Sequence, residues 1–330
     1  MREKRTSLDD IAKAVGVSKA TVSFVLNGKG DEFNISKKKQ EIIREKAKEM
    51  AYVPNFYAKS LRQGKTKTIG VVLADITNPF YAQLCKTIQE ELYSRDYSTI
   101  IVNTNDDPSM EKSLMRELIN RSIDGMIISP CNRIQELIPI LNDTHIPVVF
   151  ADRPGDEFAD FVGVSNVEEG QKLVGLFSKK PKKIALVCPS ETNVITIQER
   201  IDGISNQCKK DGIECISFSV LDEQKHIDQQ ILDTIQSGTD AIIALNNTVT
   251  FKVLSALHQN KIPVPQKVKL ISFDDHDAFP YMDPPISAMR QPISAIGIES
   301  VGRMVERLKE SKTPGKHSLL SCTFISRSSH

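Results

Sequence analysis

Two kinds of hydrophobic pattern divide the chain. Up to about residue 50, apolar residues recur at spacings of three and four, the period of amphipathic helices. From about residue 69 onward, short β-branched runs alternate with helical segments. Four runs begin near residues 69, 98, 124 and 146, and four more begin near residues 183, 215, 240 and 268. The pattern predicts a small helical head followed by a larger α/β body.

The body is predicted to contain a repeat. The two series of runs have similar intervals, and their third members, DGMII and DAIIA, are similar in sequence. Continuous apolar runs separated by helical segments are typical of parallel sheets covered on both faces by helices. A helix is predicted over QPISAIGIESVGRMVERLKE, and SLLSCTFISRSS is predicted to close the structure with strand. We therefore expect two copies of one parallel α/β unit, which would form two lobes.

The head is predicted to begin with two short helices. Ser7 is a suitable N-cap, and the acidic residues after Leu8 favour a helix start. Gly16 ends the first helix because glycine adopts the left-handed conformation at little cost, and Ser18 caps the second helix. The apolar positions predicted to face inward are Leu8, Ile11, Ala12, Val15, Val22, Val25 and Leu26.

The spacing within these helices is that of a DNA-reading helix-turn-helix. The small residue Ala12 is followed four positions later by Gly16 and six positions after that by Val22. The exposed side of the second helix is short and polar, which suits base edges and phosphates. A third helix is predicted from Ser36 to about residue 50. Its predicted core face is Ile42, Ile43, Ala47 and Met50. An ordinary three-helix bundle is the alternative.

Charge is distributed unevenly along the chain. Residues 1–67 carry 16 Lys and Arg against 8 Asp and Glu, whereas the remainder carries 27 against 34. A basic head on an acidic body indicates that the head meets a polyanion. A solvated lysine face is the alternative reading. Apolar content of 40% and charged content of 26% are those of an ordinary globular protein.

Several classes of protein are excluded by what the sequence lacks. No apolar run approaches the roughly 18 residues of a membrane span, and residues 1–10 lack the apolar stretch of a signal peptide. We therefore expect a cytoplasmic protein with no membrane partner. The cysteines are scattered, so we expect no metal, no disulfide and no cofactor. They are Cys85, Cys131, Cys188, Cys208, Cys215 and Cys322.

Polar side chains follow the apolar runs of the body. They include Asp75, Asn103, Asn105, Asp152, Arg153, Asn246, Asn247, Asp274 and Asp275. Ligands of open parallel sheets collect at the carboxyl ends of strands, and two facing lobes would form a cleft there. Carboxylates and amides pair well with hydroxyls, and Phe80 offers a flat apolar surface. The combination favours a sugar or sugar derivative, while a purine fits less well.

Three segments together resemble a known family. They are SLDDIAKAVGVSKATVSFVLNG, YVPNFYAKSLRQGKTKTIGVV and DITNPFYAQL. Their ordered succession resembles the lac repressor family of bacterial transcription regulators, from Ser7 to the closing FISRSS. The resemblance implies an N-terminal all-α helix-turn-helix domain and an α/β periplasmic-binding-protein-like body of two parallel-sheet lobes.

At the DNA, the resemblance implies that Lys19 and Ala20 open the recognition helix and face bases. The other implied contacts in the head are Ser7, Leu8, Ser18, Thr21, Ser23, Asn27, Ser36 and Tyr52. Phe24 also belongs to this surface, but it stands where many members carry a base-reading arginine, so a shifted operator preference is expected. The loop over residues 28–35 is longer than in the lac repressor itself.

A short helix is predicted to follow the head. Proline after Val53 disfavours helix in the residue before it, and Asn55 caps a helix over residues 56–63, which Gly64 ends. A helix this short is marginal alone, so it orders on DNA or against a second copy. By resemblance, Leu61 wedges into the minor groove beside Ala58 and Lys59. A flexible tether is the alternative.

In the body, the resemblance implies a small effector, commonly a carbohydrate. Matching positions are Asp75, Asn78, Phe80, Asp152, Arg200, Asn246 and Asp274. For each acid, a helix cap or turn residue is the alternative. The implied domains are residues 1–52, a hinge over 53–66 and the body over 67–330. Its first lobe covers about 67–165 and 292–320, and its second lobe covers about 166–291 and 321–330.

These features predict an allosteric DNA-binding regulator, expected to repress, that binds a pseudo-palindromic operator as a homodimer. A sugar-binding transport protein would need a signal peptide and no basic helix-turn-helix. An α/β enzyme would need a nucleotide loop, a nucleophile motif or metal-ligand spacing, none of which is present. We therefore expect a protein that is not an enzyme.

Overall fold

The computed structural model describes residues 6–53, 64–131, 139–141, 146–155, 159–189, 194–220, 224–310 and 314–330. The chain divides into two compact units, Met1–Thr66 and Lys67–His330. Each unit has its own hydrophobic core. No helix in these ranges is both long enough and apolar enough to cross a membrane.

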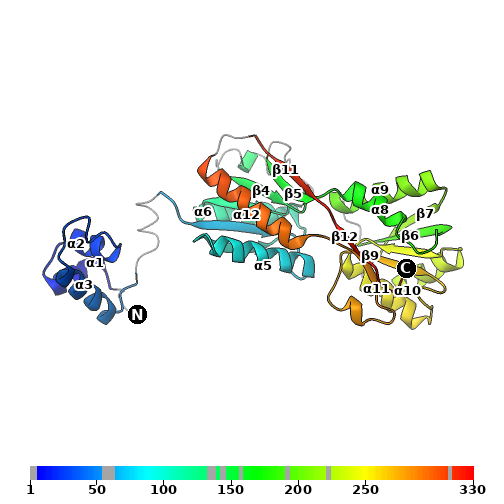
Figure 1. Ribbon diagram of the computed structural model, residues 1–330, viewed down its shortest axis with the longest axis horizontal. Coiled ribbons are helices and arrows are strands. Elements are labelled where there is room, and N and C mark those ends of the chain that lie inside the picture. The colour runs from blue at the N-terminus through cyan, green and yellow to red at the C-terminus, as the bar shows by residue number, and fades with distance from the viewer. Residues whose placement is uncertain are drawn as a thin grey trace. The chain divides into compact units, whose positions relative to one another are not determined.

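The first unit contains α1 (Leu8–Val15), α2 (Lys19–Leu26) and α3 (Lys37–Glu49) (Figure 1). Ser7 and Asp10 form a capping box at the start of α1, and Gly16 ends that helix with φ of 69°. Ser18 caps α2 by accepting a hydrogen bond from the Thr21 backbone N–H. The three helices predicted for the head are thus confirmed, whereas the short helix predicted over residues 56–63 lies outside the described residues. The buried core of the unit is Ile11, Ala12, Val22, Val25, Ile43 and Ala47.

The predicted core face of the third helix is wrong at Ile42. This side chain is 44% exposed, whereas its neighbour Ile43 is fully buried. Adjacent helical residues point about 100° apart, so the two cannot both face the same core. Gln40 and Ala47 lie three residues before and four residues after Ile43, and both are buried with it.

The second unit contains two six-stranded sheets. The first sheet has the order β11-β5-β4-β3-β1-β2, and all of its pairs are parallel. Its strands are β1 (Thr68–Leu73), β2 (Ser98–Asn103), β3 (Gly125–Ile128), β4 (Val148–Ala151), β5 (Asp160–Val164) and β11 (His317–Leu320). The second sheet has the order β12-β10-β9-β8-β6-β7, in which only β12 is antiparallel to its neighbour.

The strands of the second sheet are β6 (Lys183–Cys188), β7 (Glu214–Ser219), β8 (Ala241–Ala244), β9 (Lys269–Phe273), β10 (Ser287–Arg290) and β12 (Thr323–Ile325). All eight strands predicted from the apolar runs are confirmed, with starts within two residues of the expected positions. The two sheets follow the same order of four strands, which agrees with the predicted repeat.

Helices cover both faces of each sheet (Figure 1). On the first sheet, α5 (Pro79–Tyr93) and α12 (Ile293–Lys309) pack on one face and α6 (Pro108–Asn120) on the other. On the second sheet, α8 (Asn166–Val174) and α9 (Ile195–Asp211) pack on one face. The other face carries α10 (Gln224–Gln236), α11 (Asn247–Gln259) and the short 3-10 helix η2 (Phe279–Tyr281).

The chain passes between the two lobes after β5, after β10 and after β11. The predicted helix near the C-terminus is confirmed as α12, which lies on the first sheet. The closing segment contains two strands, β11 in the first sheet and β12 in the second. These crossings hold the carboxyl ends of the strands of the first sheet and of the second sheet next to one cavity.

Candidate functional site

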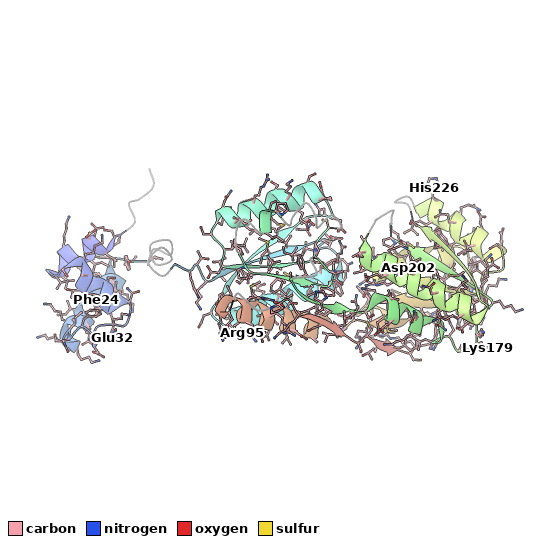
Figure 2. All side chains as sticks on the ribbon, turned by 90° about the horizontal axis from the view of Figure 1, so that it is seen from above. Phe24, Glu32, Arg95, Lys179, Asp202 and His226 are labelled. Atoms are coloured by element: carbon pink, nitrogen blue, oxygen red, sulfur yellow. The ribbon has the colours of Figure 1, made fainter. Side chains whose placement is uncertain are left out.

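The exposed face of α2 is the candidate DNA-reading surface. Ala20, Ser23, Phe24 and Asn27 recur at spacings of three and four on the side of α2 opposite the buried Val22 and Val25. The Asn27 side-chain amide donates to the Ser23 carbonyl over 2.6 Å. Figure 2 labels Phe24 on this helix. The arrangement presents a narrow polar stripe with one aromatic ring.

Neighbouring residues hold the start of this helix. The Ser18 and Thr21 hydroxyls lie 2.8 Å apart, and the Lys19 ammonium group pairs with Asp9 of α1 over 2.7 Å. Both members of that pair are more than half exposed, so it adds little stability. It nevertheless places the Lys19 charge where α1 meets α2.

The other predicted DNA contacts in the head fall into two groups. Ser7 and Ser36 precede α1 and α3, although only Ser7 makes a side-chain cap bond. Leu8 and Tyr52 are half-buried and pack on the core of the unit. Four predicted contacts of the hinge lie outside the described residues. They are Asn55, Ala58, Lys59 and Leu61.

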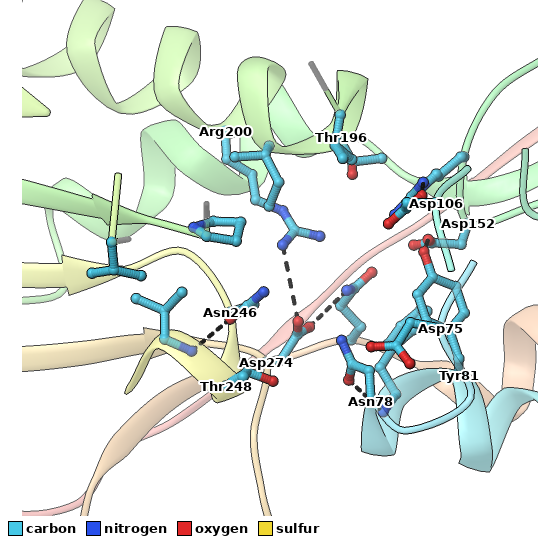
Figure 3. Close-up of a pocket in the computed structure, with 18 of the residues that line it drawn as sticks. Asp75, Asn78, Tyr81, Asp106, Asp152, Thr196, Arg200, Asn246, Thr248 and Asp274 are labelled. Carbon is cyan, nitrogen blue, oxygen red and sulfur yellow. Dashed lines mark hydrogen bonds and ion pairs between the residues drawn. The ribbon is translucent and has the colours of Figure 1, made fainter. Parts of the chain in front are cut away.

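A cavity of about 360 Å³ lies between the two lobes of the body. Its walls are formed by the carboxyl ends of strands and the first turns of the helices that follow them (Figure 3). The volume is in the range of small-molecule sites. All seven residues predicted from the sequence line it, namely Asp75, Asn78, Phe80, Asp152, Arg200, Asn246 and Asp274.

The wall from the first lobe centres on Asp152. The Tyr81 hydroxyl donates to the Asp152 carboxylate over 2.8 Å, and the Ser129 hydroxyl donates to the Tyr81 oxygen over 3.3 Å. Arg153 is 5% exposed and pairs with Asp106 through both terminal nitrogens. Burial raises the pKa of Asp152, and the Arg153 guanidinium partly offsets that rise.

The wall from the second lobe centres on Arg200. Its Nε donates to the Asn166 side chain over 2.8 Å, and its Nη1 donates to the Leu245 carbonyl over 2.9 Å. The guanidinium lies 3.6 Å over the Phe273 ring. Arg200 also lies 3.9 Å from the Asp274 carboxylate. Figure 3 shows Arg200 reaching from α9 toward Asp274. Four residues, from α8 and from the ends of β8 and β9, therefore surround this one cation.

Asp274 is held by Arg200 of the second lobe and by the segment that leads across to the first lobe. It accepts a hydrogen bond of 2.7 Å from Gln291, which lies in the crossing segment between β10 and α12. Burial raises the pKa of Asp274, and the Arg200 charge opposes that rise. Two buried polar atoms at the cavity wall, Arg153 Nε and Gln291 Oε1, find no hydrogen-bond partner among the described residues.

Close helix packing positions Arg200. A Cβ atom at Gly203 of α9 would lie 2.1 Å from the Val167 carbonyl oxygen of α8. A Cβ atom at Gly170 of α8 would lie 2.8 Å from the Arg200 carbonyl oxygen. Both glycines are required for the two helices to approach this closely, and Arg200 lies on the stretch of α9 that they hold.

Comparisons with known proteins identify the family of the chain. Residues 7–55 match the family described as bacterial regulatory proteins, lacI family, and residues 175–330 match the periplasmic binding protein-like domain. The probable HTH-type transcriptional regulator EndR of Paenibacillus polymyxa is 29% identical over 315 residues, which cover 93% of this chain and 92% of EndR. The chain belongs to the LacI family of bacterial regulatory proteins.

Solved structures agree with the fold of this LacI-family protein. The lac repressor dimer bound to operator and the anti-inducer ONPF matches with a TM-score of 0.87 at 20% identity, over 99% of both chains. The transcriptional regulator CelR in complex with cellobiose matches with a TM-score of 0.70 at 22% identity, over 99% of this chain and 100% of that chain. The predicted fold class is confirmed.

Family membership makes the protein a DNA-binding transcriptional regulator, as predicted. The alternative of an α/β enzyme is not supported, because the matching proteins are regulators. The predicted contacts of individual residues with DNA or with an effector stay predictions.

Three of the predicted cavity residues also have local structural roles in the LacI-family body. Asn78 caps α5 by accepting from the Phe80 backbone N–H over 3.0 Å. Asn246 caps α11 by accepting from the Val249 N–H over 2.8 Å. Asp75 does not cap α5, but the alternative of a turn residue holds for it, because its carboxylate accepts from the Thr77 N–H and hydroxyl in the turn before that helix. These three side chains are therefore held rigidly where they line the cavity.

Sequence reasoning missed several residues of the cavity wall. They are Tyr81, Asp106, Arg153, Pro189, Val194, Thr196, Ile197, Val220, Thr248, Val249, Lys252 and Gln291. Arg153 had a signal, since it follows Asp152 directly at the end of a strand. Gln291 had none, because its contact depends on how the chain crosses between the lobes.

Proposed function

We propose that this regulator binds a pseudo-palindromic operator as a homodimer and that a small polar ligand between the lobes controls its operator affinity. Repression is the expected outcome on transcription. Access to chromosomal DNA requires a cytoplasmic location. The observation that carries the proposal is that Asp152 of one lobe and Arg200 with Asp274 of the other line the same cavity in a chain with a LacI-family head.

The proposed ligand is a sugar or sugar derivative. Buried carboxylates and guanidinium groups converge on the cavity, and they pair well with hydroxyls that both donate and accept. Phe80 supplies an apolar surface for the ring face. The cellobiose complex of CelR supports the same class.

The proposed control is a shift between two lobe arrangements. A ligand that contacts both Asp152 and Arg200 binds one lobe arrangement more tightly than the other. It stabilises the preferred arrangement by the difference between its two binding free energies. The change in lobe arrangement alters the spacing of two hinge segments across the homodimer. A coupling free energy of about 1–3 kcal/mol would change operator affinity about 5- to 150-fold.

The hinge is proposed to act in the minor groove. Residues 53–66 connect the head to the body, and within them Leu61 is proposed as the wedge, with Ala58 and Lys59 in the groove. Replacing Leu61 by Ala is expected to weaken specific binding much more than nonspecific binding. Equal losses would remove the wedge from the proposal.

The proposal is tested by selecting operators from random duplexes with the full chain. Sugars and nucleotides are then titrated against the selected complex. We expect a site with two-fold symmetry, an affinity that falls steeply with salt, and at least one sugar that shifts it. A selected site without two-fold symmetry contradicts the paired-hinge arrangement. A response to nucleotides alone contradicts the sugar class.

A further inference from the structure

The loop between α2 and α3 is a built part of the head. Gln40 of α3 is 2% exposed and donates to the Asp31 carboxylate and to the Ile35 carbonyl, both over 2.8 Å. Gly30 packs on the same side chain, because a Cβ atom there would lie 2.4 Å from the Gln40 side-chain carbonyl carbon. The Lys29 backbone N–H donates to the Phe24 carbonyl over 2.8 Å. The loop is thus tied to both helices.

This loop carries an aromatic ring onto the recognition helix. The rings of Phe33 and Phe24 stack with centroids 3.6 Å apart and planes 11° apart. Phe33 is 49% exposed. Phe24, which Figure 2 labels, is half-buried and lies on the same side of α2 as Ala20 and Asn27. A stacked pair of rings, one half-buried (Phe24) and one exposed (Phe33), therefore lies on the candidate DNA-reading surface.

A phenyl ring cannot read DNA as an arginine does. It has no donor for guanine and no acceptor for cytosine or adenine. The apolar group that base edges present in the major groove is the thymine methyl, and Phe and Ala side chains contact it. Ala20 lies one turn before Phe24 on the same stripe. At Ala20 and Phe24 this face therefore matches methyl groups, whereas Ser23 and Asn27 on the same stripe match hydrogen-bonding edges.

We propose that Phe24 is a specificity-determining residue that contacts a thymine methyl group in each operator half-site, with Phe33 as the positioning residue that fixes its ring. The inference rests on the proposed function, since it assigns a base preference to the proposed operator. The proposed binding partner of the Phe24–Phe33 pair is duplex DNA. Lys29 in the loop and Lys38 in α3 are exposed cations that could meet flanking phosphates, and Lys29 pairs with the exposed Glu32 over 3.8 Å.

The test replaces each thymine of the selected half-site, one at a time, by deoxyuridine, which removes only the methyl group. For the full chain we expect one or two positions at which operator affinity falls about three- to fivefold, the factor for losing the burial of one methyl group. Phe24→Ala is expected to bind the thymine and uracil duplexes alike. Phe24→Leu, which keeps an apolar contact, retains part of the discrimination.

Three controls separate the possible reasons for failure. Circular dichroism of each variant establishes that the head is folded, and Phe33→Ala gives a second variant whose discrimination should be reduced. The salt slope of binding should be unchanged in Phe24→Ala, because a phenyl ring neutralises no phosphate. Equal affinity of the full chain for all thymine and uracil duplexes, or discrimination that survives in folded Phe24→Ala, overturns the inference. Selection of no operator at all contradicts instead the proposed function.

Discussion

Asp152 and Asp274 occupy corresponding places in the two lobes. Each follows a central strand, β4 or β9, and each has a left-handed backbone, with φ of 69° and 67°. Both side chains are buried at the cavity, and burial raises the pKa of both carboxyl groups. A conformation that non-glycine residues rarely adopt, combined with a desolvated acid, is typical of functional sites.

Replacing Asp152 by Asn tests whether this desolvated carboxylate is kept for the ligand. Its pKa is raised in the folded chain, whereas unfolded aspartates titrate near about 4. The folded chain therefore holds the Asp152 proton more tightly than the unfolded chain does. The stability that this proton contributes is fully present below about pH 4 and is lost as the pH rises through the folded pKa. We expect Asp152→Asn to raise the free energy of unfolding at pH 7 and to leave it unchanged at pH 4.

In the same Asp152→Asn variant, ligand affinity at pH 7 should fall about tenfold or more, because a charge-assisted hydrogen bond is lost. Denaturant unfolding at the two pH values and calorimetric titration measure the two effects. An equal loss of stability at both pH values, with ligand affinity intact, would assign Asp152 a purely structural role.

Arg200→Lys keeps the charge but removes the planar fork. Lysine cannot donate to Asn166 and Leu245 while it faces Asp274 in the way the guanidinium does. We expect ligand affinity to fall about tenfold or more and operator affinity without ligand to stay within about twofold. Arg121→Lys is the matched control, since Arg121 pairs with Glu117 on the exposed side of α6, away from the cavity. If both variants bind ligand like the parent, Arg200 is no ligand contact.

Gly203→Ala tests the helix packing that positions Arg200. The new Cβ would overlap the Val167 carbonyl, which is backbone and cannot rotate away. We expect a loss of about 1–3 kcal/mol in stability together with weaker ligand binding. Gly302→Ala is the control, because an added Cβ at Gly302 of α12 would meet no described atom within 4 Å apart from its chain neighbours and its own helix backbone. It should gain up to about 1 kcal/mol. Equal effects of the two changes would contradict the packing described for α8 and α9.

Ile43 and Ile42 form a matched pair in the head. Ile43 is fully buried, and Ile43→Ala should cost about 2–5 kcal/mol. Ile42 is 44% exposed, and Ile42→Ala should change stability by less than about 0.5 kcal/mol. Amide hydrogen exchange across α1, α2 and α3 in the full chain reports the local free energy. Comparable losses of amide protection in the two variants would show that Ile42 contributes to the core as much as Ile43 does.

Local pattern predicted the elements because it acts within a few residues. The spacing of Ala12, Gly16 and Val22 reflects one helix crossing. The β-branched runs become strands, which are buried inside the sheets and only partly buried at the edges, as in β2 and β7. Polar residues after those runs were placed at the cavity by a general property of parallel sheets. The same reasoning could not choose between Ile42 and Ile43. Either residue fits the apolar face of α3, depending on where around the helix axis that face is centred.

The unpredicted contacts join distant parts of the chain. Tyr81 and Asp152 are 71 positions apart, and Gln291 reaches Asp274 from a crossing segment between lobes. The stacking of Phe33 on Phe24 depends on a loop that Gln40 anchors. Such contacts follow from tertiary packing, which hydrophobic periodicity does not encode.

Effector control of DNA binding is tested most directly by a reciprocal titration. Operator affinity is measured with and without a saturating sugar, and sugar affinity is measured with and without the operator. Linkage requires the two ratios to be equal, and we expect a factor of about 5 to 150. A sugar that binds in the cavity while both ratios stay at one would contradict control of the head by the interlobe ligand.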